Sequence, residues 1–254
     1  WQTARIICSL IVLIVGGGLT AALLRESPER MGVKPWGYGK TESKKESTVI
    51  DVSADEGIMA SSARKSPALW LLILMAGLFV ISASFIQQVA RYASTNDALG
   101  AAVGALAVSI AMIASMAGKF GLGWVCDHFG ARISGILSGI CGILGPVLML
   151  VGGSNVMMFY IGIAFFGVGY SALNIVPPMT CRQAFGNKDY ANVFSMVATG
   201  LNVFSGFSAL IYAQIFDISG SYVGAFYMMI AFYIIIVIIS LFIVPLGRKS
   251  WASK

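Results

Sequence analysis

Long runs of apolar residues, separated by short polar stretches, dominate the chain. A helix needs about 20 apolar residues to cross the roughly 30 Å hydrocarbon core of a bilayer. Seven runs are long enough, namely residues 6–24, 68–90, 99–118, 133–151, 156–177, 191–216 and 222–246. Because an open strand would leave backbone groups unpaired in lipid, all seven are predicted to be helices. The pattern therefore predicts an all-α polytopic membrane protein with seven transmembrane helices.

Composition supports a membrane protein and excludes a nucleic-acid partner. Of the 254 residues, 57% are hydrophobic and only 11% are charged, whereas a soluble domain has about 25% charged residues. So few charges cannot cover the surface of a soluble protein of this size. The net charge of +6 comes from basic residues that are spread over the loops and form no single patch, so it does not indicate nucleic-acid binding.

The basic residues also predict the orientation in the membrane. Loops on one side carry 15 of the 17 Lys and Arg residues, whereas the other side carries only Arg5 and Arg91. Basic loops favour the cytoplasmic side. We therefore expect Trp1 outside, Lys254 in the cytoplasm, and the chain in the cell (inner) membrane.

Residues 25–66 are the one long polar linker. This stretch mixes seven acidic with eight basic residues and has no long apolar period. Such a composition predicts a partly disordered loop on the cytoplasmic side, with a short helix near 51–60.

A distinctive polar stretch, GKFGLGWVCDHFGAR at residues 118–132, separates the third and fourth spans. Gly123, Asp127, Gly130 and Arg132 give the spacing G-x-x-x-D-x-x-G-x-R, and His128 follows the aspartate. This resembles the loop signature of the major facilitator superfamily of transporters, where a cation usually stands at the position of His128. The resemblance implies a cytoplasmic latch that closes one end of a transporter and releases as the protein rocks.

A purely structural interpretation of the same stretch remains open. Asp127 could cap the helix that starts near Ile133, and Arg132 is near enough in sequence to pair with it. His128 is either a pH-sensitive replacement for the usual cation or a solvated loop residue. Lys119 and Asp127 are expected at the inner edge of the membrane, with no charged residue deep in any span.

Further motifs extend the resemblance over the whole chain. WQTARI at 1–6 and RESPERMGVKPWG at 25–37 resemble the start of the sixth facilitator helix and the sequence after it. Residues 1–24 would then end a missing N-terminal six-helix half, and 25–66 would be the central cytoplasmic loop. Residues 67–247 would form the C-terminal six-helix bundle, with 248–254 as a cytoplasmic tail.

Two more stretches, VPPMTCRQAFGNKDYANVFS at 176–195 and DISGSYVGAFYMM at 217–229, resemble one branch of the family. This branch contains the oxalate/formate antiporters and the monocarboxylate carriers. Its members usually have a basic residue in helix eight or eleven. The absence of one inside 99–118 and 191–216 weakens the case for a carboxylate substrate.

Polar residues inside the spans are candidates for substrate contact. In lipid such residues cost energy unless they face protein or water, although a Ser or Thr can instead bond to its own helix backbone. The candidates fall on shared helical faces and are Ser84, Gln87, Gln88, Tyr170, Asn174, Thr199, Asn202 and Ser205. Glycines at 135, 139 and 142 are spaced for close helix packing.

The sequence is interpreted as a fragment of a secondary active transporter, an antiporter or symporter that works by alternating access. Its partners would be a small-molecule substrate (an organic anion is one candidate), membrane lipid and the missing N-terminal half, with no cofactor. Four scattered cysteines and a single histidine predict no metal site, no disulfide and no catalytic residue. The alternative is a seven-helix receptor or sensor, although 222–246 lacks the lysine that a retinal protein needs.

Overall fold

The computed structural model describes residues 6–7, 9–10, 12–18, 20, 57–96 and 98–249. The chain forms two compact units, residues 1–46 and 47–254. The first unit contains a π-helical segment at Val12–Gly17. The rest of the predicted 6–24 span, most of the linker and the tail after residue 249 lie outside the described residues.

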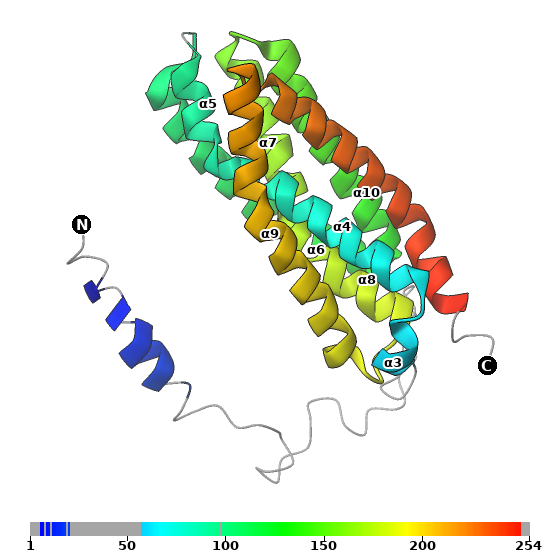
Figure 1. Cartoon of the computed structure of the whole chain (residues 1–254). Coiled ribbons are helices and arrows are strands. Elements are labelled where there is room, and N and C mark those ends of the chain that lie inside the picture. Colours follow the sequence, from blue (N-terminus) through cyan, green and yellow to red (C-terminus); the bar gives the residue numbers. More distant parts are fainter. Residues whose placement is uncertain are drawn as a thin grey trace. The chain divides into compact units, whose positions relative to one another are not determined.

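The second unit is a bundle of long helices (Figure 1), which agrees with the predicted all-α membrane fold. Five helical stretches in the described part of the chain are long and apolar enough to cross a membrane. The helices are α3 (Ala60–Ala63), α4 (Pro67–Ala83), α5 (Val89–Thr95), α6 (Gly100–Gly152), α7 (Val156–Ser171), α8 (Val176–Phe185), α9 (Tyr190–Ser219) and α10 (Val223–Lys249).

Helix α6 runs through residues 118–132, where the sequence predicted a polar loop between two spans. Its 53 residues would extend about 80 Å at 1.5 Å per residue, far more than one membrane crossing. Gly130, at φ +87° and ψ 164°, divides it into Gly100–Phe129 and Ala131–Gly152. The predicted loop is therefore wrong, because the first helix continues to Phe129 and the turn is confined to Gly130, where a glycine tolerates the positive φ.

Two other spans are interrupted by short 3₁₀ turns. Ser84–Gln87 separates α4 from α5, and Ala172–Asn174 separates α7 from α8. The prolines at 177 and 178 do not end the predicted 156–177 helix. They lie in the first turn of α8, where a missing N–H removes no helical hydrogen bond, so the helix continues to Phe185.

Glycines on the second half of α6 bring it against α7 and α10, as their spacing predicts. A Cβ on Gly135 would lie 2.6 Å from Ser240 Oγ, and one on Gly142 would overlap the Tyr233 ring. On the other side, a Cβ on Gly145 would lie 2.8 Å from the backbone nitrogen of Phe166. Small residues therefore set the distance between these helices.

The 3₁₀ turn at Ser84–Gln87 is held by an aromatic cluster around Phe85. The Phe85 ring centroid lies 5.9 Å from that of Phe166, 5.8 Å from Tyr212 and 5.2 Å from Phe226. Tyr212 also donates a hydrogen bond to the Ile81 carbonyl at 3.0 Å. The turn thus contacts α7, α9 and α10 together, which fixes where α4 ends.

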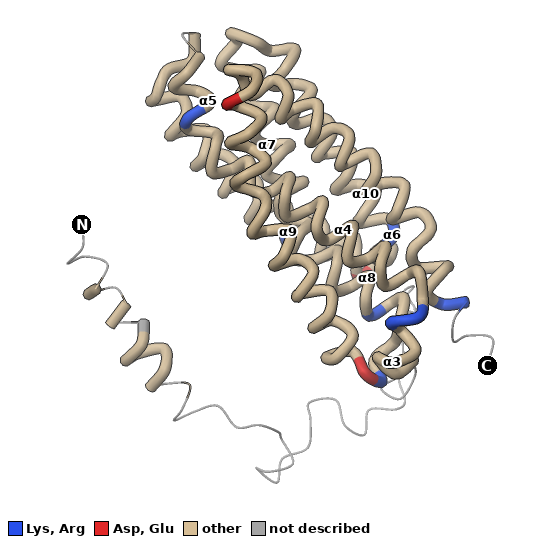
Figure 2. Tube along the Cα trace, viewed as in Figure 1, with Lys and Arg blue, Asp and Glu red and all other residues tan. Residues whose placement is uncertain are grey.

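The two ends of the bundle differ in charge. Figure 2 shows Lys and Arg residues gathered around α3 and the ends of α8 and α10. We call this the linker end. The opposite end, with the connections at residues 98–99, 153–155 and 220–222, is the far end. Of the described charged residues, only Arg91 and Asp217 belong to the far end.

The glycine contact between α6 and α10 makes a direct prediction. Gly142→Ala should lower the free energy of unfolding by about 1–3 kcal/mol, because the added methyl group overpacks against Tyr233. Gly121→Ala is the matched control, since nothing lies within 4 Å of its Cβ position. Thermal unfolding in detergent compares the two variants, and equal midpoints would contradict the packing described.

Candidate functional site

Helix α9 presents the most open surface of the bundle. It packs chiefly against α4, and its buried residues are Val193, Val197, Ser208 and Tyr212. The remainder of its circumference is exposed or only half-buried. A helix this exposed in a membrane must meet lipid, water or another protein surface.

The exposed surface of α9 is divided by polarity. Ser195, Thr199, Asn202 and Gly206 fall within about 60° of one another at 100° per residue, and we call this the polar sector of α9. A neighbouring sector is apolar, with Val203, Phe207 and Leu210 at 55%, 56% and 60% exposure. The apolar sector suits lipid, whereas the polar sector suits water or protein.

The eight predicted substrate contacts are not joined into one cluster, since no hydrogen bond links any two of them within the described structure. Gln87, Asn174, Thr199, Asn202 and Ser205 are exposed. Thr199 and Asn202 donate to the backbone of α9, at Ser195 O and Ala198 O, both at 2.8 Å. Asn202 keeps its amide oxygen and a second N–H for other partners.

The remaining three candidates are half-buried and serve the bundle itself. Ser84 Oγ donates to Val80 O at 2.8 Å, and Gln88 Oε1 accepts the Tyr222 hydroxyl at 3.1 Å. The Tyr170 ring lies 6.5 Å from Phe166. Ser84 and Gln88 on the second span thus have partners within the bundle, whereas Gln87 on the same span is exposed.

The first half of α6 also has an apolar sector beside one that carries charge. Leu106, Ile113 and Phe120 form an apolar sector at 52%, 70% and 73% exposure. The adjacent sector contains the exposed residues Lys119 and Asp127 together with the exposed Met112 and Met116, and we call it the charged sector of α6. Lys119 makes no hydrogen bond or ion pair with any other described residue.

Lys119 lies near the middle height of the bundle, not at its edge as expected. A Cβ on the adjacent Gly118 would be 2.7 Å from Ser171 Oγ, and residue 171 is close to the midpoint of Val156–Phe185. From Lys119 the helix continues for ten more residues before Gly130, about 15 Å. A lysine at the centre of a helix costs about 2.5–3.5 kcal/mol in lipid, so this side chain requires water or protein opposite it.

The polar sector of α9 reaches the same height. Gly142, midway along Ala131–Gly152, contacts Gly169 and Tyr233. Tyr233 of α10 connects this level to α4, because its ring lies 6.2 Å from that of Phe79. Gly77, two residues before Phe79 in α4, packs in turn against Phe204 of α9. Asn202 is therefore within a turn of the mid-height level that Lys119 occupies on α6.

The signature residues around Gly130 do not form the predicted cap. Gln183 Oε1 accepts the Ala131 N–H at 3.0 Å, so α8 caps the second half of α6. Asp127 and Arg132 are both exposed and form no ion pair with each other in the part of the chain that the structure describes. Asp127 thus remains available to a group outside the described structure.

His128 contacts its own helix and not a carboxylate. Its ring stacks on Trp124 at a centroid distance of 4.6 Å, and Nδ1 lies 2.9 Å from Trp124 O. These contacts favour an interfacial aromatic pair, with the histidine exposed at the linker end.

A second feature of the linker end went unpredicted: the linker is bonded to the loop between α8 and α9. Asp189 Oδ2 accepts the Ala60 N–H at 2.7 Å, and Asn192 Nδ2 donates to Asp189 Oδ1 at 2.7 Å. The Ile58 N–H donates to Phe185 O at 3.1 Å. We call these contacts the linker clamp. The bonds of Ala60 and Ile58 join segments that lie more than 120 residues apart.

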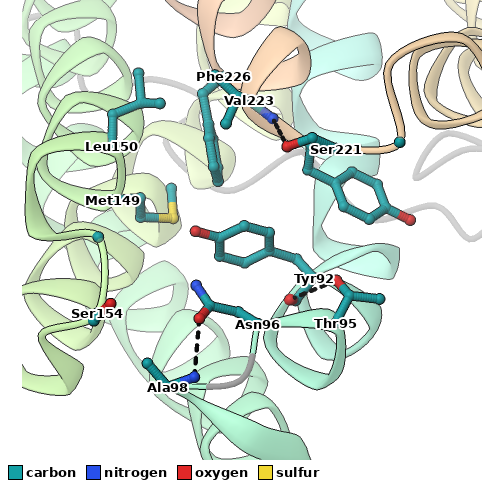
Figure 3. A pocket seen from close by; sticks show the side chains of 13 residues that line it. Tyr92, Thr95, Asn96, Ala98, Met149, Leu150, Ser154, Ser221, Val223 and Phe226 are labelled. Carbon is teal, nitrogen blue, oxygen red and sulfur yellow. Dashed lines mark hydrogen bonds between the residues drawn. The ribbon is translucent and has the colours of Figure 1, made fainter.

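A cavity of about 500 Å³ opens at the far end between α5, the end of α6 and the start of α10. Figure 3 shows the Tyr92 ring at its centre, with Asn96, Met149 and Phe226 around it. None of the eight predicted contacts lines this cavity. None of the described residues that line it is charged, and Thr95, Ser154 and Ser221 contribute hydroxyls. Within the described residues, no cluster of His, Cys, Asp or Glu could hold a metal ion.

Sequence comparison identifies the family. The model of the Major Facilitator Superfamily matches residues 1–182 and, in a second match, residues 92–253. The chain therefore belongs to the Major Facilitator Superfamily and is a membrane transporter. No curated protein matches the chain. Neither the fold nor the family match favours the receptor alternative.

The linker clamp should depend on the charge of Asp189. The Ala60 N–H, and then the Asn192 amide, hold the pKa of this carboxyl below its usual value of 3.8. The clamp is then stabilised fully above about pH 3.8, and this stabilisation is lost as the pH falls through the lower pKa of the folded state. Hydrogen exchange at the Ala60 amide should be slow at pH 6 and fast in Asp189→Ala. Asp217→Ala at the far end is the control, and unchanged exchange in Asp189→Ala would contradict the clamp.

Proposed function

We propose that the chain forms one wall of the solute pathway of a secondary active transporter. The polar sector of α9, the charged sector of α6 and Asn174 support this proposal, because polar surface at mid-membrane needs a facing protein wall or water. Alternating access then comes from rocking of this bundle against a facing bundle. The observation that carries the proposal is Lys119, an unbonded cation at the middle height of the bundle.

An organic anion is the substrate class that Lys119 supports. A lysine ammonium is a point charge with three donors, and a carboxylate bound beside it at mid-membrane replaces the water that the cation would otherwise need. The likeness of residues 176–195 and 217–229 to the oxalate/formate and monocarboxylate branch agrees with this chemistry. We infer that Asn202 and Thr199 supply neutral hydrogen bonds to the same solute.

The substrate proposal predicts the effect of removing the Lys119 charge. Lys119→Gln should reduce uptake of labelled oxalate or lactate by about tenfold or more, because a hydrogen bond to a charged group is lost. Lys119→Arg should retain part of the activity. Lys188→Gln, an exposed lysine outside the pathway, is the control. Counterflow in proteoliposomes that contain the native transporter gives the rates, and full oxalate and lactate uptake by Lys119→Gln would exclude this role.

We propose that Gly123, Asp127, His128, Gly130 and Arg132 form a gate at the linker end. Asp127 is exposed about 80° around α6 from Lys119 and makes no bond to the described residues, so a facing bundle can supply its partner. Asp127→Asn should slow transport without changing the amount of protein in the membrane, whereas Asp217→Asn should not. Transport rates normalised to protein measure both effects, and a normal rate in Asp127→Asn would reduce the motif to a turn.

We propose the same division of the chain that the motifs suggest. Residues 67–247 act as the C-terminal six-helix half, residues 1–24 end a facing N-terminal half, and 25–66 connect them in the cytoplasm. The excess of Lys and Arg at the linker end supports a cytoplasmic C-terminus. In sealed, right-side-out vesicles, residues 248–254 should be protected from a protease added outside. Cleavage of these residues would show that the orientation is the reverse of the one proposed.

A further inference from the structure

A separate cavity of about 390 Å³ lies at the linker end, where α4 begins and α10 ends. Its walls come from both helices, from α3 and from the turn after α3. The residues that line it are Ser62, Lys65, Ser66, Pro67, Leu246 and Lys249. It therefore brings together two ammonium groups and two hydroxyls from distant parts of the sequence.

The lining groups are suited to an anion. Lys65 and Lys249 supply positive charge, and Arg64 and Arg248 are their neighbours in sequence. The carboxylates among the described residues are Asp127, Asp189 and Asp217, and none of them lines the cavity. A ligand with several negatively charged oxygens would meet only donors there.

Ser66 adds a donor that the fold leaves unused. Its side chain is only 8% exposed, and its Oγ accepts the Ala68 N–H at 3.3 Å as the cap of α4. The hydroxyl proton donates to no described residue. A phosphate oxygen in the cavity can accept this proton while the lysines neutralise its charge.

An exposed tryptophan locates the cavity at the membrane surface. Trp70, one turn into α4, is 63% exposed, and its Nε1 donates to the Arg64 carbonyl at 3.2 Å. Tryptophans in membrane proteins concentrate at the level of the lipid headgroups. Pro67 and Leu246 give the cavity an apolar wall on the membrane side, which suits the glycerol end of a lipid.

We propose that this cavity binds the phosphate of an anionic phospholipid headgroup, such as that of phosphatidylglycerol. Basic pockets between helix ends are suited to such headgroups. The site is independent of the solute pathway, because none of its residues belongs to the polar sector of α9 or the charged sector of α6. Inorganic phosphate in solution offers the same negatively charged oxygens, so the test distinguishes a lipid headgroup from free phosphate.

The test measures lipid retention by the purified protein. Native mass spectrometry from mixed micelles should show preferential retention of phosphatidylglycerol over phosphatidylcholine. Lys65→Gln with Lys249→Gln should weaken this retention by about thirtyfold, and each single change by about fivefold. Lys188→Gln, at the same end but outside the cavity, should retain the lipid as the unchanged protein does.

Two results would overturn the proposal. Equal phosphatidylglycerol retention by the double variant and the unchanged protein would exclude the cavity as the site. Inorganic phosphate that displaces the lipid, or that raises the thermal midpoint as phosphatidylglycerol does, would identify a soluble ligand instead. If the double variant unfolds, phosphatidylglycerol retention by the two single variants decides the same question. Their thermal midpoints show whether they are folded.

Discussion

Close packing through the glycines of α6 is the constraint on which the bundle depends. Lipid tails are as apolar as leucine, so no hydrophobic force drives two helices together inside a membrane. Packing and hydrogen bonds must do so, and they act only at short distance. Because Gly135 and Gly142 have no side chain, α10 approaches α6 closely, and Gly145 allows α7 the same approach on the other side.

This tightly packed part of the bundle determines which surfaces remain open. With α10 and α7 held against α6, the polar sector of α9 and the charged sector of α6 remain exposed in the described bundle. Lys119 is the most costly group on that open surface, since a lysine in lipid at mid-height is unfavourable by several kcal/mol. The arrangement is stable in a membrane when water, solute or a facing protein wall covers this surface.

The pattern of apolar runs predicts where the helices of the described bundle lie. It fails where a helix continues through polar residues. The predicted 191–216 span agrees with Tyr190–Ser219 to within three residues at each end. The stretch after Gly118 was interpreted as a loop because Lys119, Asp127 and His128 are polar. The signal for a continuing helix was present: the small or apolar residues Gly118, Leu122 and Cys126 repeat every four residues and are buried.

Long-range contacts had no signal in the sequence. Gln183 caps Ala131 from 52 residues away, and Asp189 accepts the Ala60 amide from 129 residues away. Neither partner can be identified from spacing along the chain, because the pairing depends on how α8 packs against α6 and on where the linker meets the bundle. Gln88 accepts the Tyr222 hydroxyl from 134 residues away, and that partner likewise has no signal in the spacing along the chain.

The central claim is that the polar sector of α9 lines an aqueous path while its neighbour faces lipid. The adjacent residues Asn202 and Val203 are both exposed in the structure, and they form a matched pair. In a background with the four native cysteines replaced by alanine, Asn202→Cys and Val203→Cys are treated with a membrane-impermeant maleimide in membrane vesicles. Labelling of Asn202→Cys without labelling of Val203→Cys is the predicted result. Equal labelling, or labelling at 203 alone, would contradict a solute pathway on this face of α9.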